Sequence, residues 1–171
     1  ALDVEAPRDD LEALASRIET FAGVDAVDPP SNLRASLRPY QQEGFSWLAA
    51  MTDLGLGVVL ADDMGLGKTV QTIALLTARP GRALVVAPTS VVHNWVTELA
   101  AFAPELAVHL HHGPQRGTPP DDADVVITSY PLLRRDFEVL GAIEWHSLVL
   151  DEAQTLKNPG SAVAAAARGL R

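Results

Sequence analysis

The chain contains no cysteine, which excludes disulfide bonds, thiolate metal sites and cysteine catalysis. It has no run of about 18 apolar residues, the length that a helix needs to span a bilayer. Its first residues, 1–5, are acidic and lack the basic start and apolar stretch of a signal peptide. These absences argue against a membrane partner and favour a protein of the cytoplasm, near the nucleoid if the organism is bacterial.

Basic residues are scarce. The 171 residues contain 13 Lys plus Arg against 22 Asp plus Glu, a net charge of −9, whereas a dedicated nucleic-acid-binding module is normally basic. The acidity is uneven, because residues 1–28 hold eight acids and two bases and leave a net charge of −3 to the other 143 residues. A nucleic-acid role therefore survives for the rest of the chain.

The acidic segment has a simple pattern of its own. Residues 9–22 place four apolar side chains on one helical stripe and predict a short amphipathic helix: Leu11, Leu14, Ile18 and Phe21. Two consecutive prolines then lie inside 27–32, a stretch typical of a linker. We expect an acidic helical leader and linker over 1–32 and one domain over 33–171.

Short apolar runs alternate with helical patterns through the rest of the chain. The predicted strands are 58–61, 83–87, 106–110, 125–127 and 148–150, and the predicted helices run from Pro39 to near Gly55, over 69–77 and over 90–102. Continuous β-branched runs between helices are typical of a parallel sheet covered on both faces. The predicted fold class is therefore α/β, with a surface loop over 112–124 that contains Pro and Gly.

The most informative motif is Asp62-Asp63-Met64-Gly65-Leu66-Gly67-Lys68-Thr69, between a predicted strand and a predicted helix. Glycines let backbone N–H groups approach phosphate oxygens, and a helix start adds partial positive charge. Lys68 would reach the β- and γ-phosphates of ATP, and the Thr69 hydroxyl would bind Mg²⁺. The first glycine of the usual motif falls at Asp62, so a plain Gly-rich turn is the alternative interpretation.

A second acidic motif, Asp151-Glu152-Ala153-Gln154, follows the last predicted strand. Carboxylates at the C-terminal edge of a parallel sheet lie where such sheets bind ligands. Asp151 would hold Mg²⁺, and Glu152 would orient and deprotonate the attacking water. Taken alone, Asp-Glu after an apolar run is equally typical of a helix start.

These blocks, in this order, resemble the Swi/Snf-type ATPases, helicase-like DNA translocases of helicase superfamily two. The blocks are Leu37–Leu48, Ala61–Thr72, Val86–Ser90 with Asn94, Trp95 and Glu98 beyond it, Ile127–Tyr130, and Asp151–Gln154. The resemblance covers about residues 33–160. It implies a RecA-like ATP-binding lobe with ATP and Mg²⁺ as cofactors, and in it the aspartate at position 62 is typical.

The resemblance also implies roles for single residues. Gln41 would bind the adenine edge, although an exposed helix glutamine is the plainer interpretation of that residue alone. Arg38 and Tyr40 would lie near the base or ribose, with a structural role as an equally good interpretation of Tyr40. Gln154 would couple the nucleotide site to DNA or to a second lobe, and a solvated helix residue is an equally good interpretation. The full set of nucleotide-binding residues that it implies is Arg38, Gln41, Asp63, Met64, Gly65, Leu66, Gly67, Lys68, Thr69 and Val70.

Nucleic-acid contacts would come from Ser90, Thr128 and Ser129, since hydroxyls bind phosphate oxygens without reading sequence. Helix capping is an equally good interpretation of these three residues. The three tryptophans, Trp47, Trp95 and Trp145, are predicted to be core or packing residues.

The resemblance implies an ATPase that translocates on double-stranded DNA. The alternatives are another phosphate-loop enzyme, such as a kinase or an RNA-directed helicase, and a nucleotide-binding module without turnover. We expect the second lobe to be missing here and the chain alone to be nearly inactive. In the RecA-like lobes that the sequence resembles, a later strand inserts between strands 57–61 and 147–151. We therefore expect these two strands either to lie apart across a gap or to be bridged by a segment from another molecule.

Overall fold

The computed structural model describes residues 15–21, 23–63, 65–158 and 160–170. The chain divides into two compact units, one formed by Ala1–Pro29 with Ser36–Leu75 and the other by Pro30–Ala35 with Leu76–Arg171. The predicted domain from residue 33 onward stays a prediction. Within the second unit, the segment 30–35 is held by the Arg34 N–H, which donates to the Phe102 carbonyl at 2.7 Å.

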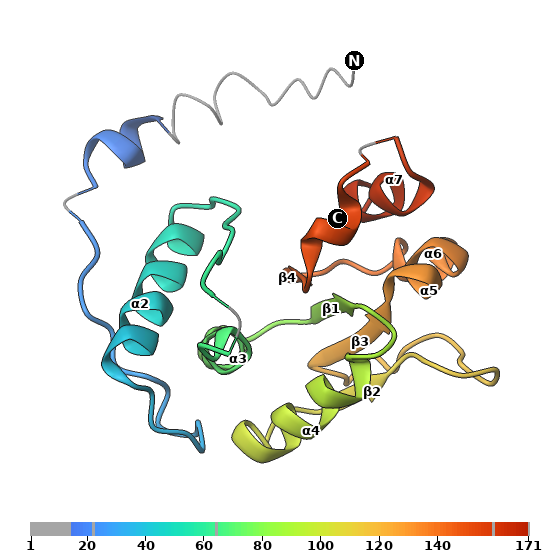
Figure 1. Cartoon of the computed structure of the whole chain (residues 1–171), viewed down its shortest axis with the longest axis horizontal. Coiled ribbons are helices and arrows are strands. Elements are labelled where there is room, and N and C mark those ends of the chain that lie inside the picture. Colours follow the sequence, from blue (N-terminus) through green and yellow to red (C-terminus); the bar gives the residue numbers. More distant parts are fainter. Residues whose placement is uncertain (1–14, 22, 64, 159, 171) are drawn as a thin grey trace. The chain divides into compact units, whose positions relative to one another are not determined.

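The second unit is built on a four-stranded parallel sheet (Figure 1). Its strands are β1 (Ala83–Ala87), β2 (Val108–Leu110), β3 (Val125–Ser129) and β4 (Ser147–Leu150), in the spatial order β2-β3-β1-β4. Every residue of the inner strands β1 and β3 is buried, as continuous apolar runs between two helical layers require. The predicted α/β fold with a parallel sheet is confirmed.

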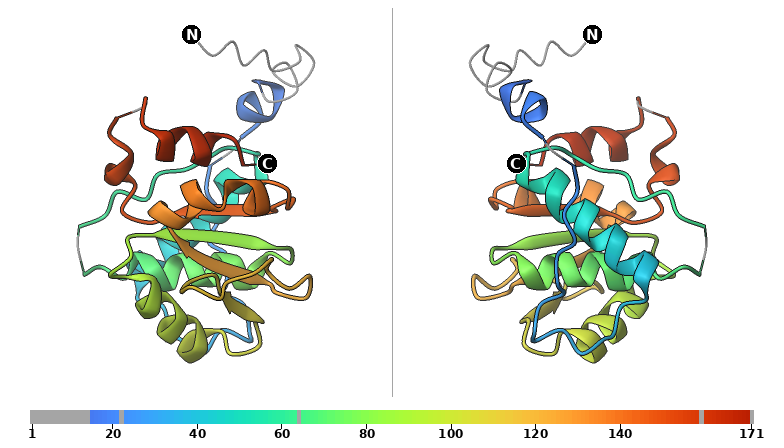
Figure 2. Two further views of the ribbon diagram at one scale, coloured as in Figure 1. Left: turned by 90° about the vertical axis from the view of Figure 1, so that its right-hand side faces the viewer. Right: turned by 90° about the vertical axis from the view of Figure 1, so that its left-hand side faces the viewer.

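Helices cover both faces of this sheet (Figure 2). Helix α4 (Val92–Phe102) lies on one face, and α5 (Tyr130–Arg135), α6 (Phe137–Leu140) and α7 (Ala162–Arg168) lie on the other. The Ser161 hydroxyl caps α7 by accepting from the Ala164 N–H at 3.2 Å, and the small alanines of α7 pack closely on α5. The main core is formed by Leu84, Val86, Ala123, Val126, Tyr130, Leu133, Leu140, Trp145, Ala166 and Ala167.

The first unit contains α2 (Pro39–Asp53) and the start of α3 (Lys68–Ala78), both predicted. Proline at the first position of α2 loses no hydrogen bond, and the Gln41 side chain accepts from the Arg38 N–H at 2.9 Å. The helix ends where Gly55 takes the left-handed conformation, with φ of +77°. A short 3₁₀ helix, η1 (Ala153–Leu156), follows β4 in the second unit.

The predicted strand over 58–61 is wrong: residues 57–61 have no regular secondary structure, and Val59 is 80% exposed. An apolar run becomes a strand only when a neighbour takes up its backbone hydrogen bonds. The described sheet has β1 to β4 as its members and does not include 57–61. The expected separation of two strands therefore does not describe this structure, since only 147–150 is a strand.

The predicted leader helix is seen in part. Residues 15–19 are helical, whereas Leu11 and Leu14 lie outside the described residues. Ile18 and Phe21, the two described residues of the apolar stripe, are 49% and 37% exposed and so are not buried in a core. Over the described part of the chain, no helix is both long and apolar enough to cross a membrane.

Candidate nucleotide-binding site

The phosphate-loop motif forms a tight turn that leads into α3. Gly65 and Gly67 have φ of +84° and +79°, a left-handed conformation that side-chain-bearing residues rarely adopt. The helix begins at Lys68, so the N–H groups of its first turn point back towards the loop. Met64, predicted to bind nucleotide, lies outside the described residues.

The Lys68 ammonium is held inside this turn. It donates to the carbonyl oxygens of Asp62 at 2.7 Å and Asp63 at 3.0 Å. An ammonium carries three N–H donors, so two carbonyl contacts leave donor capacity for a phosphate oxygen. Thr69 and Val70 follow in the first turn of α3, and both are half-buried. The loop therefore presents a positive charge together with a helix N-terminus, the combination that binds phosphate.

Gln41 lies against the same loop. Its side-chain nitrogen donates to the Leu66 carbonyl at 3.1 Å, its oxygen accepts from the Arg38 N–H, and only 9% of its surface is exposed. A Cβ on Gly67 would come within 2.4 Å of that nitrogen. Because an amide has two donors and two acceptor lone pairs, Gln41 can bridge α2 to the loop and keep capacity for a base.

An open hollow of about 660 Å³ lies beside the loop in the same unit. Tyr40, Glu43, Gly44 and Trp47 of α2 line one side, and Val59–Asp62 with Leu66 line the other. Tyr40 is 37% exposed, so its ring is available for stacking. The position and the aromatic lining of the hollow suit a planar base.

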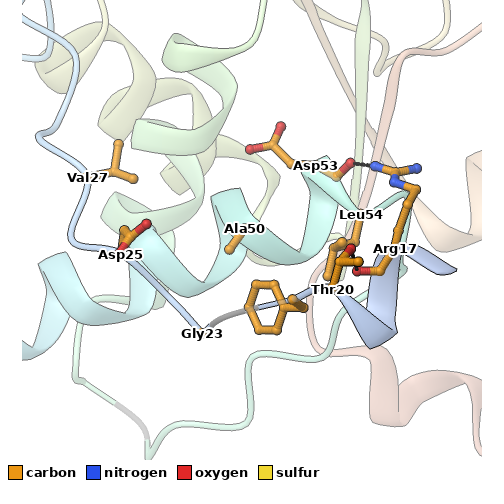
Figure 3. A pocket seen from close by; sticks show the side chains of 9 residues that line it. Arg17, Thr20, Gly23, Asp25, Val27, Ala50, Asp53 and Leu54 are labelled. Atoms are coloured by element: carbon orange, nitrogen blue, oxygen red, sulfur yellow. Dashed lines mark hydrogen bonds between the residues drawn. The ribbon is translucent and has the colours of Figure 1, made fainter. Parts of the chain in front are cut away.

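A different hollow lies between the leader and α2 (Figure 3). It measures about 530 Å³ and is lined by residues such as Thr20, Asp25 and Ala50. Arg17 closes one end by donating to the Asp53 carbonyl. No predicted nucleotide-binding residue lines this hollow, so it is not part of the candidate site.

The acidic motif lies in the second unit, directly after β4. The Asp151 N–H donates to the Val86 carbonyl at 2.9 Å, which extends the pairing of β4 with β1 by one residue. One carboxylate oxygen of Asp151 accepts from the Trp95 indole N–H at 2.8 Å, and the Tyr130 hydroxyl donates to the Asp151 carbonyl at 2.7 Å. The backbone and the side chain of Asp151 are therefore each fixed by a hydrogen bond.

Glu152 has a left-handed backbone, with φ of +51° and ψ of +46°, and among the described residues it alone does so without being glycine. Such a conformation costs about 1–2 kcal/mol for an L-residue and is concentrated at functional sites. Its carboxylate accepts from the side-chain amide of Gln154, which is exposed in η1. Gln154 therefore lies next to Glu152, the predicted general base.

The negative charges of this motif act on nearby acids. Burial, with the charges of Asp151 and Glu152 adding to it, raises the pKa of the Tyr130 hydroxyl to about 12. Burial and then the charge of Asp151 raise the pKa of Glu98, which lies on α4 one turn after Trp95. Tyr130 therefore stays a neutral hydrogen-bond donor at any physiological pH.

Comparison with known proteins decides the family. Residues 40–171 match the SNF2-related domain. The chain belongs to the SNF2-related domain family. It is 45% identical to YwqA of Bacillus subtilis (strain 168), named an ATP-dependent helicase/translocase, over 94% of this chain and 19% of that protein. It is 42% identical to the helicase SWR1 of Yarrowia lipolytica, over 78% of this chain and 8% of that protein.

A solved structure agrees. The Sulfolobus solfataricus SWI2/SNF2 ATPase core in complex with dsDNA superposes with a TM-score of 0.81 at 42% identity, covering 86% of this chain and 32% of that one. The Sulfolobus solfataricus SWI2/SNF2 ATPase core domain gives a TM-score of 0.79 at 41% identity, covering 88% of this chain and 32% of that one. The chain therefore spans about a third of the SNF2 core and about a fifth of the Bacillus relative.

Within this SNF2-related domain, two of the three predicted nucleic-acid residues are buried. Thr128 and Ser129 are 0% and 1% exposed, and the Thr128 hydroxyl donates to the His111 carbonyl at 3.2 Å. They end β3, an inner strand with a neighbouring strand on each side. A nucleic-acid contact by either hydroxyl therefore stays a prediction that needs a change in their surroundings. Ser90 is exposed and stays a prediction.

The sequence pattern does not indicate the polar roles of two aromatic residues of the SNF2 fold. Trp95 is 3% exposed, as a core residue should be, but it also donates to Asp151. Tyr130 enters the sequence motifs only as the last residue of Ile127–Tyr130. The one available signal was that buried Trp and Tyr usually place their N–H or O–H on a partner. Nothing in the sequence says which partner that is.

Proposed function

We propose that this chain is the ATP-binding lobe of a DNA-dependent ATPase that translocates on double-stranded DNA. The observation that carries the proposal is the phosphate loop, in which Gly65 and Gly67 make the turn and the Lys68 ammonium lies over two loop carbonyls at the start of α3. Relatives named helicase or translocase, and a similar core solved with dsDNA, support the motor and its duplex substrate.

Each group of residues has a proposed task. Lys68 and the loop N–H groups would neutralise and orient the phosphates, and Glu152 would deprotonate the attacking water. Gln41, Arg38 and Tyr40 would bind the adenosine, with the base in the hollow beside α2. The rest of the proposed nucleotide-binding set is Asp63, Met64, Gly65, Leu66, Gly67, Thr69 and Val70.

The residues also fit Mg²⁺. Thr69 offers a hydroxyl and Asp151 a carboxylate, the hard oxygen ligands that this ion prefers. Asp151 is restrained by a hydrogen bond to one of its carboxylate oxygens, as metal-binding carboxylates commonly are. Bound Mg²⁺ would offset charge on the β- and γ-phosphates. We therefore propose Thr69 and Asp151 as the ligands of this ion.

We further propose that the 171 residues alone bind ATP weakly and hydrolyse it very slowly. They span 32% of the S. solfataricus core, and in related phosphoryl transfers an arginine supplied from outside the phosphate-loop domain is worth about 10³–10⁵ in rate. The ATPase rate of the chain joined to the rest of a core, titrated against duplex DNA, single-stranded DNA and RNA, separates the motor from the alternatives. Stimulation by RNA alone would indicate an RNA-directed helicase, and binding without turnover would indicate a nucleotide-binding module.

The chain offers a matched test of the phosphate loop, because it contains only two lysines. Lys68→Ala should weaken the binding of Mg²⁺·ATP by about 2–3 kcal/mol, the scale of a charge-assisted contact. Lys157→Ala removes an equal charge from an exposed position after η1 and should leave the affinity unchanged. Isothermal titration measures both. Equal affinities of Lys68→Ala and the parent chain would contradict the proposed site.

A further inference from the structure

Asp151 is held by two buried aromatic side chains that have no assigned role. One contact is made to its carboxylate and the other to its carbonyl. Trp95 comes from α4 and Tyr130 from the start of α5, so two separate elements meet at this one residue. Both side chains are 3% exposed. Buried polar atoms of this kind are placed with little freedom, because the packing around them fixes the ring.

The Trp95 contact fixes the direction of the carboxylate. An indole has a single donor, and here that donor goes to a charged oxygen at 2.8 Å. The ring cannot follow the carboxylate if it rotates, because Val92 and Leu99 anchor α4 with no exposed surface. Rotation of the Asp151 carboxylate would therefore break this hydrogen bond. While the bond is kept, the second carboxylate oxygen has a defined direction.

A negative charge on the same helix adds to this restraint. Glu98 follows Trp95 by one turn of α4, and the charge of Asp151 acts on it. The Asp151 carboxylate is thus attracted by one residue of α4 and repelled by another.

The Tyr130 contact fixes the peptide that joins Asp151 to Glu152. The phenol donates to the carbonyl of that peptide at 2.7 Å. The next residue, Glu152, has the left-handed backbone, and strained conformations persist only where surrounding contacts hold them. The Tyr130 hydroxyl is one contact placed to do so, together with the Thr155 N–H, which donates to the Glu152 carbonyl at 2.9 Å.

We propose that Trp95 and Tyr130 are positioning residues for ATP hydrolysis: Trp95 orients the Asp151 carboxylate towards Mg²⁺, and Tyr130 holds the strained turn that directs Glu152. This inference rests on the proposed function, because it assumes Mg²⁺·ATP at the candidate site. It assigns to α4 and α5 a task beyond packing against the sheet.

The chain contains a matched control for Trp95. Trp145 is also buried, and its indole N–H also makes a 2.8 Å hydrogen bond, to the Leu140 backbone carbonyl. Trp95→Phe and Trp145→Phe therefore remove the same kind of donor from two buried rings, and only the first touches Asp151. The affinity of a non-hydrolysable ATP analogue is measured for each variant with and without Mg²⁺.

Trp95→Phe should lower the Mg²⁺-dependent gain in affinity by about 10-fold or more, the usual effect of losing a partner of a metal ligand. The affinity without Mg²⁺ should not change, and Trp145→Phe should resemble the parent in both measurements. An unchanged Mg²⁺-dependent gain in Trp95→Phe overturns the positioning role. A parent chain whose affinity does not respond to Mg²⁺ overturns the proposed function as well, so the two failures are distinguishable.

A spectroscopic measurement tests the contact in case Trp95→Phe does not fold. The ¹H–¹⁵N spectrum of the parent contains the indole signals of three tryptophans, and Asp151→Asn should shift the Trp95 signal and leave the Trp145 signal in place. An unmoved Trp95 signal overturns the proposal. For the second residue, Tyr130→Phe in a chain joined to the rest of a core should lower kcat and leave nucleotide affinity unchanged, and parent-like turnover overturns its role.

Discussion

Replacing Gly67 with alanine should cost about 3–4 kcal/mol of unfolding free energy, and the structure divides that cost into two parts. The first is backbone strain of about 1–2 kcal/mol, because Gly67 has φ of +79°. The second arises because the new Cβ would lie 2.4 Å from the Gln41 side-chain nitrogen. The amide can move away only by losing its bonds to the Leu66 carbonyl and the Arg38 N–H, at about 1 kcal/mol each.

Gly65 provides the control. It has φ of +84°, but no atom lies within 4 Å of the place where its Cβ would be, so Gly65→Ala should show the strain alone. A double-mutant cycle of Gly67→Ala with Gln41→Ala isolates the second part, since alanine at 41 removes the obstructing amide. Urea unfolding measures all variants. Equal costs for Gly65→Ala and Gly67→Ala, or additivity in the cycle, would refute the proposed contact between Gln41 and the loop.

Two further predictions concern pH. Burial and the charge of Asp151 raise the pKa of Glu98, so the ionisation of Glu98 destabilises the fold as pH rises through that raised pKa. Glu98→Gln should therefore raise the melting temperature by a few degrees near neutral pH and leave it unchanged at about pH 4. The Arg116 hydrogen bond and then that of His111 lower the pKa of Asp136. The ionised Asp136 therefore contributes fully to folding stability above the ordinary Asp pKa, and this stability is lost as pH falls through the lowered pKa. Asp136→Asn should lower the melting temperature by several degrees near neutral pH, and a scan over pH should show this difference vanish in acid.

Local pattern predicts the parts of this fold that local chemistry decides. Four apolar runs are strands, and the two loop glycines have the left-handed backbone that the phosphate-loop motif requires. The fifth run, 58–61, is equally apolar and is not a strand. Its state depends on whether a neighbouring strand accepts its hydrogen bonds, and that is a property of the sheet and not of the run.

In the candidate site, too, some features follow from local sequence and others from the packing of distant elements. The sequence indicates Lys68, Asp151 and Glu152 because each follows a strand or begins a helix. It does not indicate that the Trp95 N–H meets a carboxylate 56 residues later, because that contact depends on how α4 packs against the sheet. It also places Thr128 and Ser129 correctly at a strand end, yet their burial follows from the inner position of β3, which only the strand order reveals.

The left-handed backbone at Glu152 leads to a prediction in which stability and activity change in opposite directions. Glu152→Gly should remove strain of about 1–2 kcal/mol and lose about 0.5–1 kcal/mol to the greater freedom of glycine in the unfolded chain, so the variant should be slightly more stable than the parent. Glu152→Gln keeps the strain and the size of the side chain and should unfold with the parent's free energy.

Both variants lack the carboxylate. In a chain joined to the rest of a core, the rate of ATP hydrolysis should therefore fall by about 10²–10⁴-fold in both variants, and the nucleotide affinity should stay unchanged. Urea unfolding and ATP turnover, measured on the same preparations, give the two quantities. A destabilised Glu152→Gly variant would mean that the side chain stabilises the fold and that its backbone is not strained. Parent-like turnover in Glu152→Gln would mean that another group activates the water. If both expectations hold, a glutamate at 152 reduces stability and is explained by the reaction that it serves.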